Sequence, residues 1–260
     1  MNMKTASTTK TECVKNQCKQ LNLTAVCNDL DNVLSSAESN HISYLECIKL
    51  VMETEINYRK KREMEKRLKL ARLPLEFNLD LYDFDADNGL SKQQLNQLRE
   101  LKWVEQNFNL ILMGPSGTGK TFLAGGLCFD AIELGYRAYF ETMDDLIRVL
   151  KMKDVTRKAN TEYRRIINAH LLVIDDIMMF PVNQQDAVLF FNLINELHGK
   201  TSLVITTNKS PKEWVDVLQD KVLTTALLDR ILHRCEIVKL TGTSYRMKHR
   251  KSIFDKPGEE

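Results

Sequence analysis

This chain of 260 residues lacks most of the features that would assign it to a special class of protein. No apolar run approaches the length of a membrane span, and the polar segment 1–20 has no apolar core typical of a secretion signal. None of the six cysteines forms a C-x-x-C pair and no histidine cluster accompanies them, which argues against a zinc site. The formal net charge of +2 identifies no partner. We therefore expect a cytoplasmic protein with reduced thiols and no membrane partner.

One glycine-rich segment is the strongest signal that the sequence does contain. An apolar run, 110–113, leads directly into GPSGTGKT at 114–121, a complete G-x-x-x-x-G-K-[ST] phosphate-binding loop. Glycines let backbone N–H groups curl around a polyphosphate, and the following helix directs its positive dipole end toward it. Lys120 would reach the outer phosphates and Thr121 would ligate Mg²⁺. The predicted nucleotide contacts are Gly114, Pro115, Ser116, Gly117, Thr118, Gly119, Lys120, Thr121 and Phe122.

Apolar strands and helices alternate around and beyond this loop. Strands are expected at 110–113, 137–141, 171–174, 202–206 and 235–240. Helices are expected between them, at 120–134, 143–152, 160–169, 184–198 and 224–234. This alternation predicts an α/β domain with a five-stranded parallel sheet covered on both faces, which binds ligands at the carboxyl ends of its strands.

The residues before the sheet predict a small helical module and a linker. Helical patterns follow the polar segment 1–10, and Ser43-x-x-Glu46 is a capping box that begins a longer helix. Pro74 ends that helix, and a further helix is expected at 91–107. The expected domains are a helical one at 1–73, a linker with a leading helix at 74–108, the α/β domain at 109–253 and a tail at 254–260.

Polar side chains follow two of the predicted strands. Asp175 and Asp176 come directly after the apolar run LLVI, and Asn208 follows the run that ends in Thr206-Thr207. Beside a phosphate-binding loop, Asp175 would hold Mg²⁺ and Asp176 would orient the attacking water. Asn208 could contact the terminal phosphate and that water, although a simple turn explains TTN equally well.

A helical segment just before Pro74 carries a one-sided positive charge. Eight of the fourteen residues from 59 to 72 are basic, against two glutamates. Such a run could neutralise nucleic-acid phosphates without reading bases, or it could be a solvated helix face. The candidate DNA contacts are Arg59, Lys60, Lys61, Arg62, Lys66, Arg67, Lys69 and Arg72.

Arg230 and Arg234 lie on the last predicted helix of the α/β domain. Phosphoryl transfer is strongly accelerated by an arginine that a neighbouring subunit supplies. Arg230 follows Leu227-Leu228-Asp229 and begins the polar side of an amphipathic helix, so it is the candidate for that role. A surface pair that involves Asp229 is the alternative.

Taken together, five segments resemble one family. They are KKREMEKRLKLARLP, GPSGTGKT, LLVIDD, ITTN and the stretch EWVDVLQDKVLTTALLDRILHRCEIVKLTGTSYRMK. The chain resembles the IstB-type ATP-binding helpers of insertion-sequence transposition, which are similar to the DnaC/DnaI helicase loaders of bacteria. The basic ARLP segment and the LLDRILH…GTSYRMK ending are more specific to this group than the phosphate-binding loop.

The resemblance implies an AAA+ fold with a reduced or absent C-terminal lid. It implies ATP and Mg²⁺ as cofactors, homo-oligomers on duplex DNA that bend it without reading its sequence, and stimulation of a partner transposase. It also makes Asn208 a sensor, Arg230 an arginine finger and Arg246 a second sensor. The basic run at 59–72 becomes a DNA contact of the helical domain.

The sequence departs from many AAA+ proteins at Asp176, where a glutamate is usual. The shorter carboxylate suggests slow hydrolysis that dissolves an ATP-built assembly. Two alternatives stay open: a helicase loader on the same scaffold, and a nucleotide-gated DNA scaffold that barely hydrolyses ATP. A metabolite kinase fits less well because the basic helix and the arginine helix would have no role in it.

We predict that binding to duplex DNA weakens steeply as salt rises, since each phosphate contact adds a slope of about −0.9 to the plot of log affinity against log salt. Fluorescence anisotropy with a labelled duplex, titrated at several salt concentrations, measures that slope. An affinity that barely changes with salt would show that the basic run does not hold phosphates.

Overall fold

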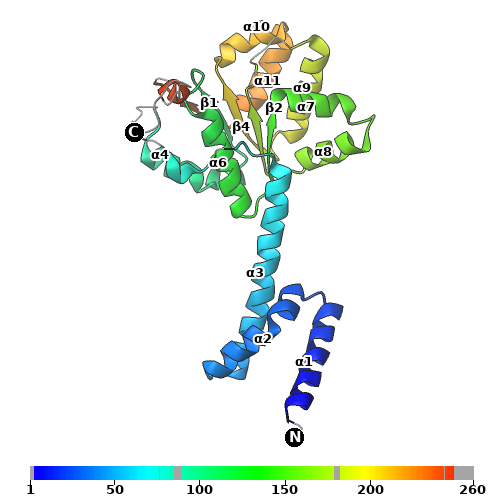
Figure 1. The fold of residues 1–260 in the computed structure, drawn as a ribbon. Helices are drawn as coiled ribbons and strands as arrows, with labels where there is room; N and C mark the ends of the chain where they lie inside the picture. Colours follow the sequence, from blue (N-terminus) through cyan, green and yellow to red (C-terminus); the bar gives the residue numbers. More distant parts are fainter. Residues whose placement is uncertain are drawn as a thin grey trace, which may run out of the picture. The chain divides into compact units, whose positions relative to one another are not determined.

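The computed structural model describes residues 3–75, 77–82, 84, 89–178, 182–242 and 244–248. The chain forms two compact units, residues 1–66 and 67–260, each of which is considered by itself (Figure 1). The division falls inside a helix, α3 (Tyr44–Ala71), whereas the sequence placed the domain boundary at the end of that helix.

The first unit is helical throughout its described residues. It contains α1 (Met3–Gln20), α2 (Thr24–Ser39) and most of α3, with a small core of Cys18, Val26 and Leu30. The predicted capping box starts α3, because the Ser43 N–H donates to Glu46 Oε2 at 2.8 Å and the Glu46 N–H donates to Ser43 Oγ at 3.3 Å. The prediction of an all-helical N-terminal module is confirmed.

A five-stranded parallel sheet organises the second unit. Its strands are β1 (Asn109–Met113), β2 (Ala138–Thr142), β3 (Leu171–Asp175), β4 (Ser202–Thr207) and β5 (Cys235–Lys239). Their order is β2-β3-β4-β1-β5, so β4 pairs with both β1 and β3. The three carboxyl ends that carry the predicted site therefore lie side by side.

Helices cover both faces of this sheet, as its apolar strands require (Figure 1). On one face α6 packs against β1, β2, β3 and β4. On the other, a cluster around Ile111, Leu172 and Ile205 includes residues of α7, α9, α10 and α11. The helices of this part are α6 (Lys120–Glu133), α7 (Met143–Met152), α8 (Arg157–Ile167), α9 (Gln184–Leu197), α10 (Trp214–Leu218) and α11 (Lys221–Leu232), with a 3₁₀ turn η2 (Pro211–Glu213).

The segment between α3 and the sheet differs from its prediction. The single helix expected at 91–107 is wrong, because Leu101 takes a left-handed conformation (φ +54°) and separates α4 (Lys92–Arg99) from α5 (Lys102–Glu105). Leu101 is buried, and the Trp103 indole N–H donates to the Leu98 carbonyl at 2.9 Å across the break. A short 3₁₀ turn, η1 (Leu79–Leu81), precedes α4.

A single four-residue helix, α12 (Tyr245–Lys248), follows β5 within the described part of the chain. A helical lid domain is absent from those residues. The observed architecture confirms the predicted fold class: a parallel α/β domain with a reduced lid, preceded by a helical region.

Two glycines on α6 let the incoming linker pass against that helix. A Cβ on Gly125 would lie 2.6 Å from Pro74 Cγ. A Cβ on Gly126 would lie 2.2 Å from Leu79 Cγ and 2.7 Å from the Phe77 carbonyl oxygen. These distances are shorter than any ordinary carbon contact, so a residue with a Cβ at either position would force the linker or α6 to shift.

We predict that Gly126→Ala lowers the free energy of unfolding by about 1–3 kcal/mol, because overpacking outweighs the gain in helix propensity. Urea unfolding measures the change. Leu79→Ala removes one of the two obstacles, so the double variant should lose less than the sum of the two single losses. Strictly additive losses would contradict the close approach.

Candidate active site

The phosphate-binding loop joins β1 to α6 and has the backbone that its glycines allow. Gly117 and Gly119 have φ of +83° and +89°, in the left-handed region that residues with a Cβ rarely enter. The Lys120 ammonium donates to the carbonyl oxygens of Gly114 and Pro115, at 2.8 and 2.7 Å. The Thr118 hydroxyl donates to the Pro115 carbonyl at 2.9 Å. This loop is therefore folded around its own lysine.

The residues after β5 lie directly against this loop. The Leu240 N–H donates to the Met113 carbonyl at 2.7 Å, and the Tyr245 N–H donates to the Gly117 carbonyl at 2.9 Å. A Cβ on Gly114 would lie 2.1 Å from the Leu240 carbonyl oxygen, and one on Gly117 would lie 2.0 Å from Ser244 Oγ. Two glycines of the loop are thus needed by the C-terminal segment as well as by the loop itself. Arg246 belongs to α12, but its side chain lies outside the described residues.

Asp175 is the centre of a hydroxyl cluster beside the loop. It ends β3 and is buried, with Thr121 Oγ1 at 3.1 Å from both of its carboxylate oxygens. Thr206 Oγ1 donates to Asp175 Oδ1 at 2.5 Å. The prediction that Thr121 and Asp175 act together is consistent with this geometry, whereas Thr206 was assigned no role from the sequence. A buried hydroxyl at the end of the strand next to Asp175 is the signal that could have identified it.

The electrostatics of Asp175 suit a cation. Burial raises the pKa of its carboxyl, the Thr206 hydrogen bond opposes that rise, and the Asp176 charge adds to it. A divalent cation would favour the ionised form and relieve this cost. The donors at hand are hydroxyl and carboxylate oxygens, which Mg²⁺ prefers, so Thr121 and Asp175 fit a magnesium–nucleotide complex.

Asp176 and Asn208 follow the ends of β3 and β4, and both are exposed. Asp176 has a left-handed backbone (φ +54°), and its N–H donates to Thr206 Oγ1 at 2.9 Å. Its side chain lines a cavity together with Asp144, Lys151 and Asp186. No contact of Asn208 among the described residues indicates a role for it. The catalytic roles of Asp176 and Asn208 therefore stay predictions.

Arg230 lies at the opposite edge of the sheet from the phosphate-binding loop. It lines a cavity of about 290 Å³ together with Asn109 and Leu203, which stand at the amino ends of β1 and β4. Arg234, His198 and His233 line the same cavity. Since β1 has five residues, its two ends are roughly 13 Å apart. Arg230 therefore lies well away from the phosphate-binding loop of its own chain.

Comparison with known proteins gives this arrangement a family. A family model described as IstB-like ATP binding protein matches residues 16–253. The chain belongs to this family. An IS21-like insertion-sequence ATP-binding protein of Bacteroides fragilis is 44% identical over 236 residues, covering 91% of this chain and 90% of the relative. An IS21 ATP-binding protein of Pseudomonas aeruginosa is 35% identical over 222 residues, covering 85% and 84%. The resemblance inferred from the motifs is confirmed.

Solved structures show the same fold at low sequence identity. DnaI has a TM-score of 0.54 at 18% identity, over 68% of this chain and 93% of its own. AMPPCP-bound DnaA from Aquifex aeolicus has a TM-score of 0.52 at 20% identity, over 68% of this chain and 54% of its own. The IstB-like chain therefore has an AAA+ type of P-loop fold. None of its described helices is long and apolar enough to cross a membrane.

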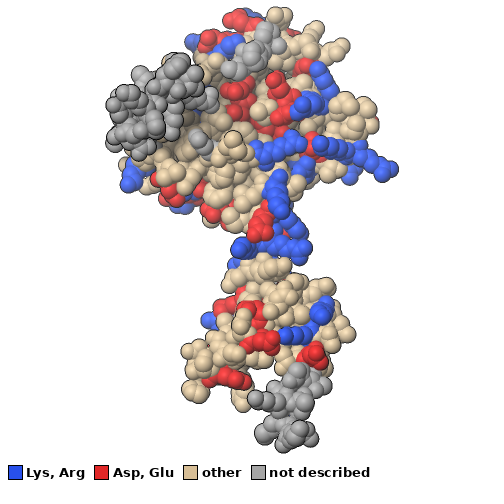
Figure 2. Space-filling model, in the orientation of Figure 1, with Lys and Arg blue, Asp and Glu red and all other residues tan. Residues whose placement is uncertain are grey.

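The basic run of the IstB-like chain divides into two groups of side chains. Lys60, Lys61, Arg62, Lys66 and Lys69 are exposed on α3, and Figure 2 shows Lys and Arg side chains gathered along this helix. The other three have partners in the protein. Arg59 pairs with Glu55 at 2.8 Å and donates to the Asn22 carbonyl, and Arg67 donates to the Gly135 carbonyl.

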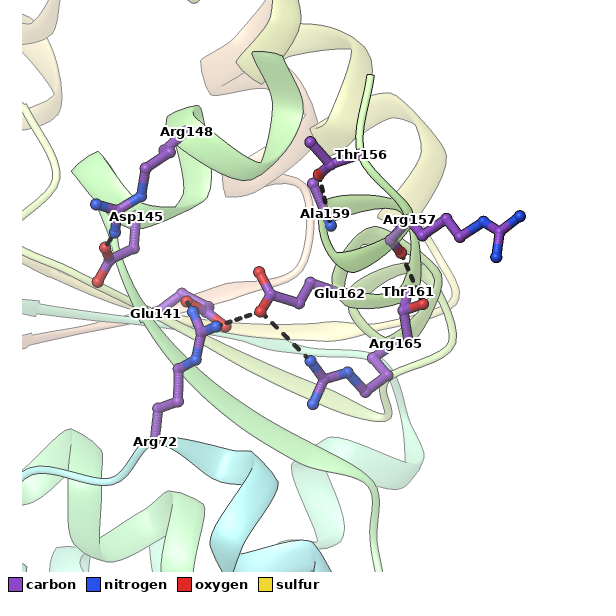
Figure 3. Close-up of polar contacts among 10 residues, drawn as sticks. All are labelled: Arg72, Glu141, Asp145, Arg148, Thr156, Arg157, Ala159, Thr161, Glu162 and Arg165. Carbon is purple, nitrogen blue, oxygen red and sulfur yellow. Dashed lines mark hydrogen bonds and ion pairs between the residues drawn. The ribbon is translucent and has the colours of Figure 1, made fainter. Parts of the chain in front are cut away.

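Arg72 has a structural role that the sequence did not indicate. It follows α3 with φ +56°, and its guanidinium lies between Glu141 of β2 and Glu162 of α8, at 2.7 and 2.6 Å (Figure 3). Burial raises the pKa of Glu141, and the Arg72 charge opposes that rise. Arg72 neutralises two buried acids and ties the end of α3 to the sheet, which gives it a structural role beside the DNA contact predicted for it.

We predict that Arg72→Ala lowers the free energy of unfolding at pH 7 by about 1.5–3 kcal/mol, because two buried carboxylates lose a charged partner. The loss should shrink toward pH 5. Without Arg72 the folded Glu141 pKa rises further above its unfolded value, so the folded state binds more protons and stability falls as pH rises. Urea unfolding at both pH values measures it.

Arg62→Ala is the matched control, since Arg62 is an exposed arginine of the same run. It should weaken DNA binding and leave unfolding within about 0.5 kcal/mol of the parent. Equal stability losses in both variants, or a loss in Arg72→Ala that ignores pH, would contradict the role given to Arg72.

Proposed function

We propose that this IstB-like chain is an ATP-dependent helper of transposition that assembles on duplex DNA and hydrolyses ATP between subunits. The observation that carries the proposal is the placement of Arg230 at one edge of the sheet and the phosphate-binding loop at the other. Because an arginine in that place cannot serve its own loop, it supports a head-to-tail assembly in which each subunit completes its neighbour's site.

Hydrolysis would divide between two chains. Lys120 would neutralise the outer phosphates, and Thr121 and Asp175 would hold a Mg²⁺ ion, which would supply further positive charge to them. Asp176 orients the attacking water, and Asn208 contacts that water and the terminal phosphate. The neighbour's Arg230 stabilises charge that develops on the transferred phosphoryl group. Arg246 is proposed as a further nucleotide contact, supported by the position of Tyr245 against the loop.

The DNA contact is proposed for the exposed members of the basic run on α3. Their side chains are exposed and positively charged, which suits phosphates rather than bases. The relatives in Bacteroides fragilis and Pseudomonas aeruginosa are ATP-binding proteins of insertion sequences. On that ground the partner enzyme is proposed to be the transposase of the same element, which the assembly recruits and stimulates on bent target DNA.

We predict that the wild-type protein forms ATP- and Mg²⁺-dependent multimers on duplex DNA, and that Lys120→Ala and Arg230→Ala both fail to do so. Lys120→Ala removes nucleotide binding, and Arg230→Ala removes the contact across the interface. Negative-stain electron microscopy or light scattering measures assembly. Arg230→Ala should also lower steady-state ATP turnover by about 10³-fold or more.

Other outcomes would point elsewhere. Assembly on single strands alone, or only with a replicative helicase, would replace this proposal with a helicase loader. Multimers that form on duplex but turn over no ATP would indicate a nucleotide-gated scaffold. Arg230→Ala multimers with wild-type turnover would remove the shared site altogether.

A further inference from the structure

The guanidinium of Arg230 is held by two groups that no catalytic role explains. Its Nη1 donates to the Ala226 carbonyl at 2.8 Å, one turn earlier on α11. Its central carbon lies 5.0 Å from the centre of the Phe191 ring, which projects from α9. A cation over an aromatic face within about 6 Å is attracted by the ring quadrupole.

An arginine that contacts a neighbouring subunit's phosphate has to be held in one conformation, and this ordering costs conformational entropy. Its side chain has several rotatable bonds, and immobilising it on assembly loses about 2 kcal/mol of rotamer freedom at most. A hydrogen bond from one end of the guanidinium and an aromatic ring 5.0 Å from its central carbon together restrict where the guanidinium can lie.

Phe191 is well suited to hold this arginine. It is half-buried and packs against the core of the α/β unit, so the core fixes the ring rather than the ring following the arginine. Its neighbour Phe190 is fully buried in the same core. The helix therefore uses one phenylalanine for packing and presents the face of the next to α11.

We propose that Phe191 is the positioning residue of Arg230, which sets the guanidinium for the phosphate of a neighbouring subunit. The inference rests on the proposed shared site and adds a residue to it. Phe191 on α9 and Arg230 on α11 belong to the same chain. At any one interface Phe191 therefore acts in the subunit that donates the arginine, and the Phe191 of the subunit that binds the nucleotide has no part in that site. A loss of activity that depends on which of the two subunits carries a Phe191 substitution therefore distinguishes a positioning role from a general effect on folding.

The test uses mixed assemblies on duplex DNA. A Lys120→Ala chain keeps the arginine and loses its own ATP site, and an Arg230→Ala chain keeps the ATP site and loses the arginine. Each alone should be inactive, and their mixture should regain turnover at the interface where the first chain's arginine meets the second chain's ATP. Phe191→Leu is then placed in one chain or the other.

We expect Phe191→Leu in the Lys120→Ala chain to lower the recovered turnover number by about 3- to 30-fold, with KM for ATP unchanged. The same change in the Arg230→Ala chain should leave the recovered turnover intact. Phe191→Tyr in the Lys120→Ala chain, which keeps the ring face, should restore it. Phe190→Leu is the control for packing: it should lower the unfolding temperature and show no preference for either chain.

Each result decides something. Equal losses from Phe191→Leu in either chain, or no loss in the arginine-donating chain, would overturn the positioning role and leave the shared site standing. A parent mixture that recovers no turnover would overturn the shared site, and the role of Phe191 with it.

Discussion

The pairing of β4 between β1 and β3 is the constraint on which the candidate site depends. It brings the phosphate-binding loop, the end of β4 and Asp175 to one edge of the sheet. At that edge Thr206 joins two residues, since its hydroxyl donates to Asp175 and accepts the Asp176 N–H. One buried hydroxyl on the middle strand thus holds the carboxylate of Asp175 and the backbone of Asp176. Loss of that strand's register would separate the loop from the acids that it needs.

The same sheet places the phosphate-binding loop and Arg230, which the proposed site combines, at opposite edges. A parallel sheet sends all its carboxyl ends to one edge, so the phosphate-binding loop and the acids gather there. The helix α11 returns the chain to the amino edge before β5, and Arg230 on its last turns is carried to that edge. A second copy of the chain is the simplest way to bring such an arginine to such a loop. On the proposed function, assembly is a requirement of the chemistry rather than an addition to it.

Patterns with a local cause could be predicted from the sequence. The phosphate-binding loop, the buried strand before Asp175 and the capping box at Ser43 each depend on a few adjacent residues, and each appears where expected. The break at Leu101 and the partners of Arg72 depend on residues far apart in the chain. Nothing near Arg72 in the sequence distinguishes it from its basic neighbours, because Glu141 and Glu162 reach it only through the fold. Charge composition identified a basic helix, but only the contacts could divide it into exposed and structural members.

The identity of Asp176 also has a local physical cause that the motif alone did not reveal. Its backbone is left-handed, a conformation that aspartate adopts more readily than glutamate because its short polar side chain tolerates the crowding there. Met178, two residues later, shares that conformation, so the turn after β3 is tightly wound. A glutamate would extend the carboxylate by one methylene but would fit this turn less well. The shorter arm can therefore be a consequence of the turn that Thr206 holds, which means that its presence does not by itself argue for a slow enzyme.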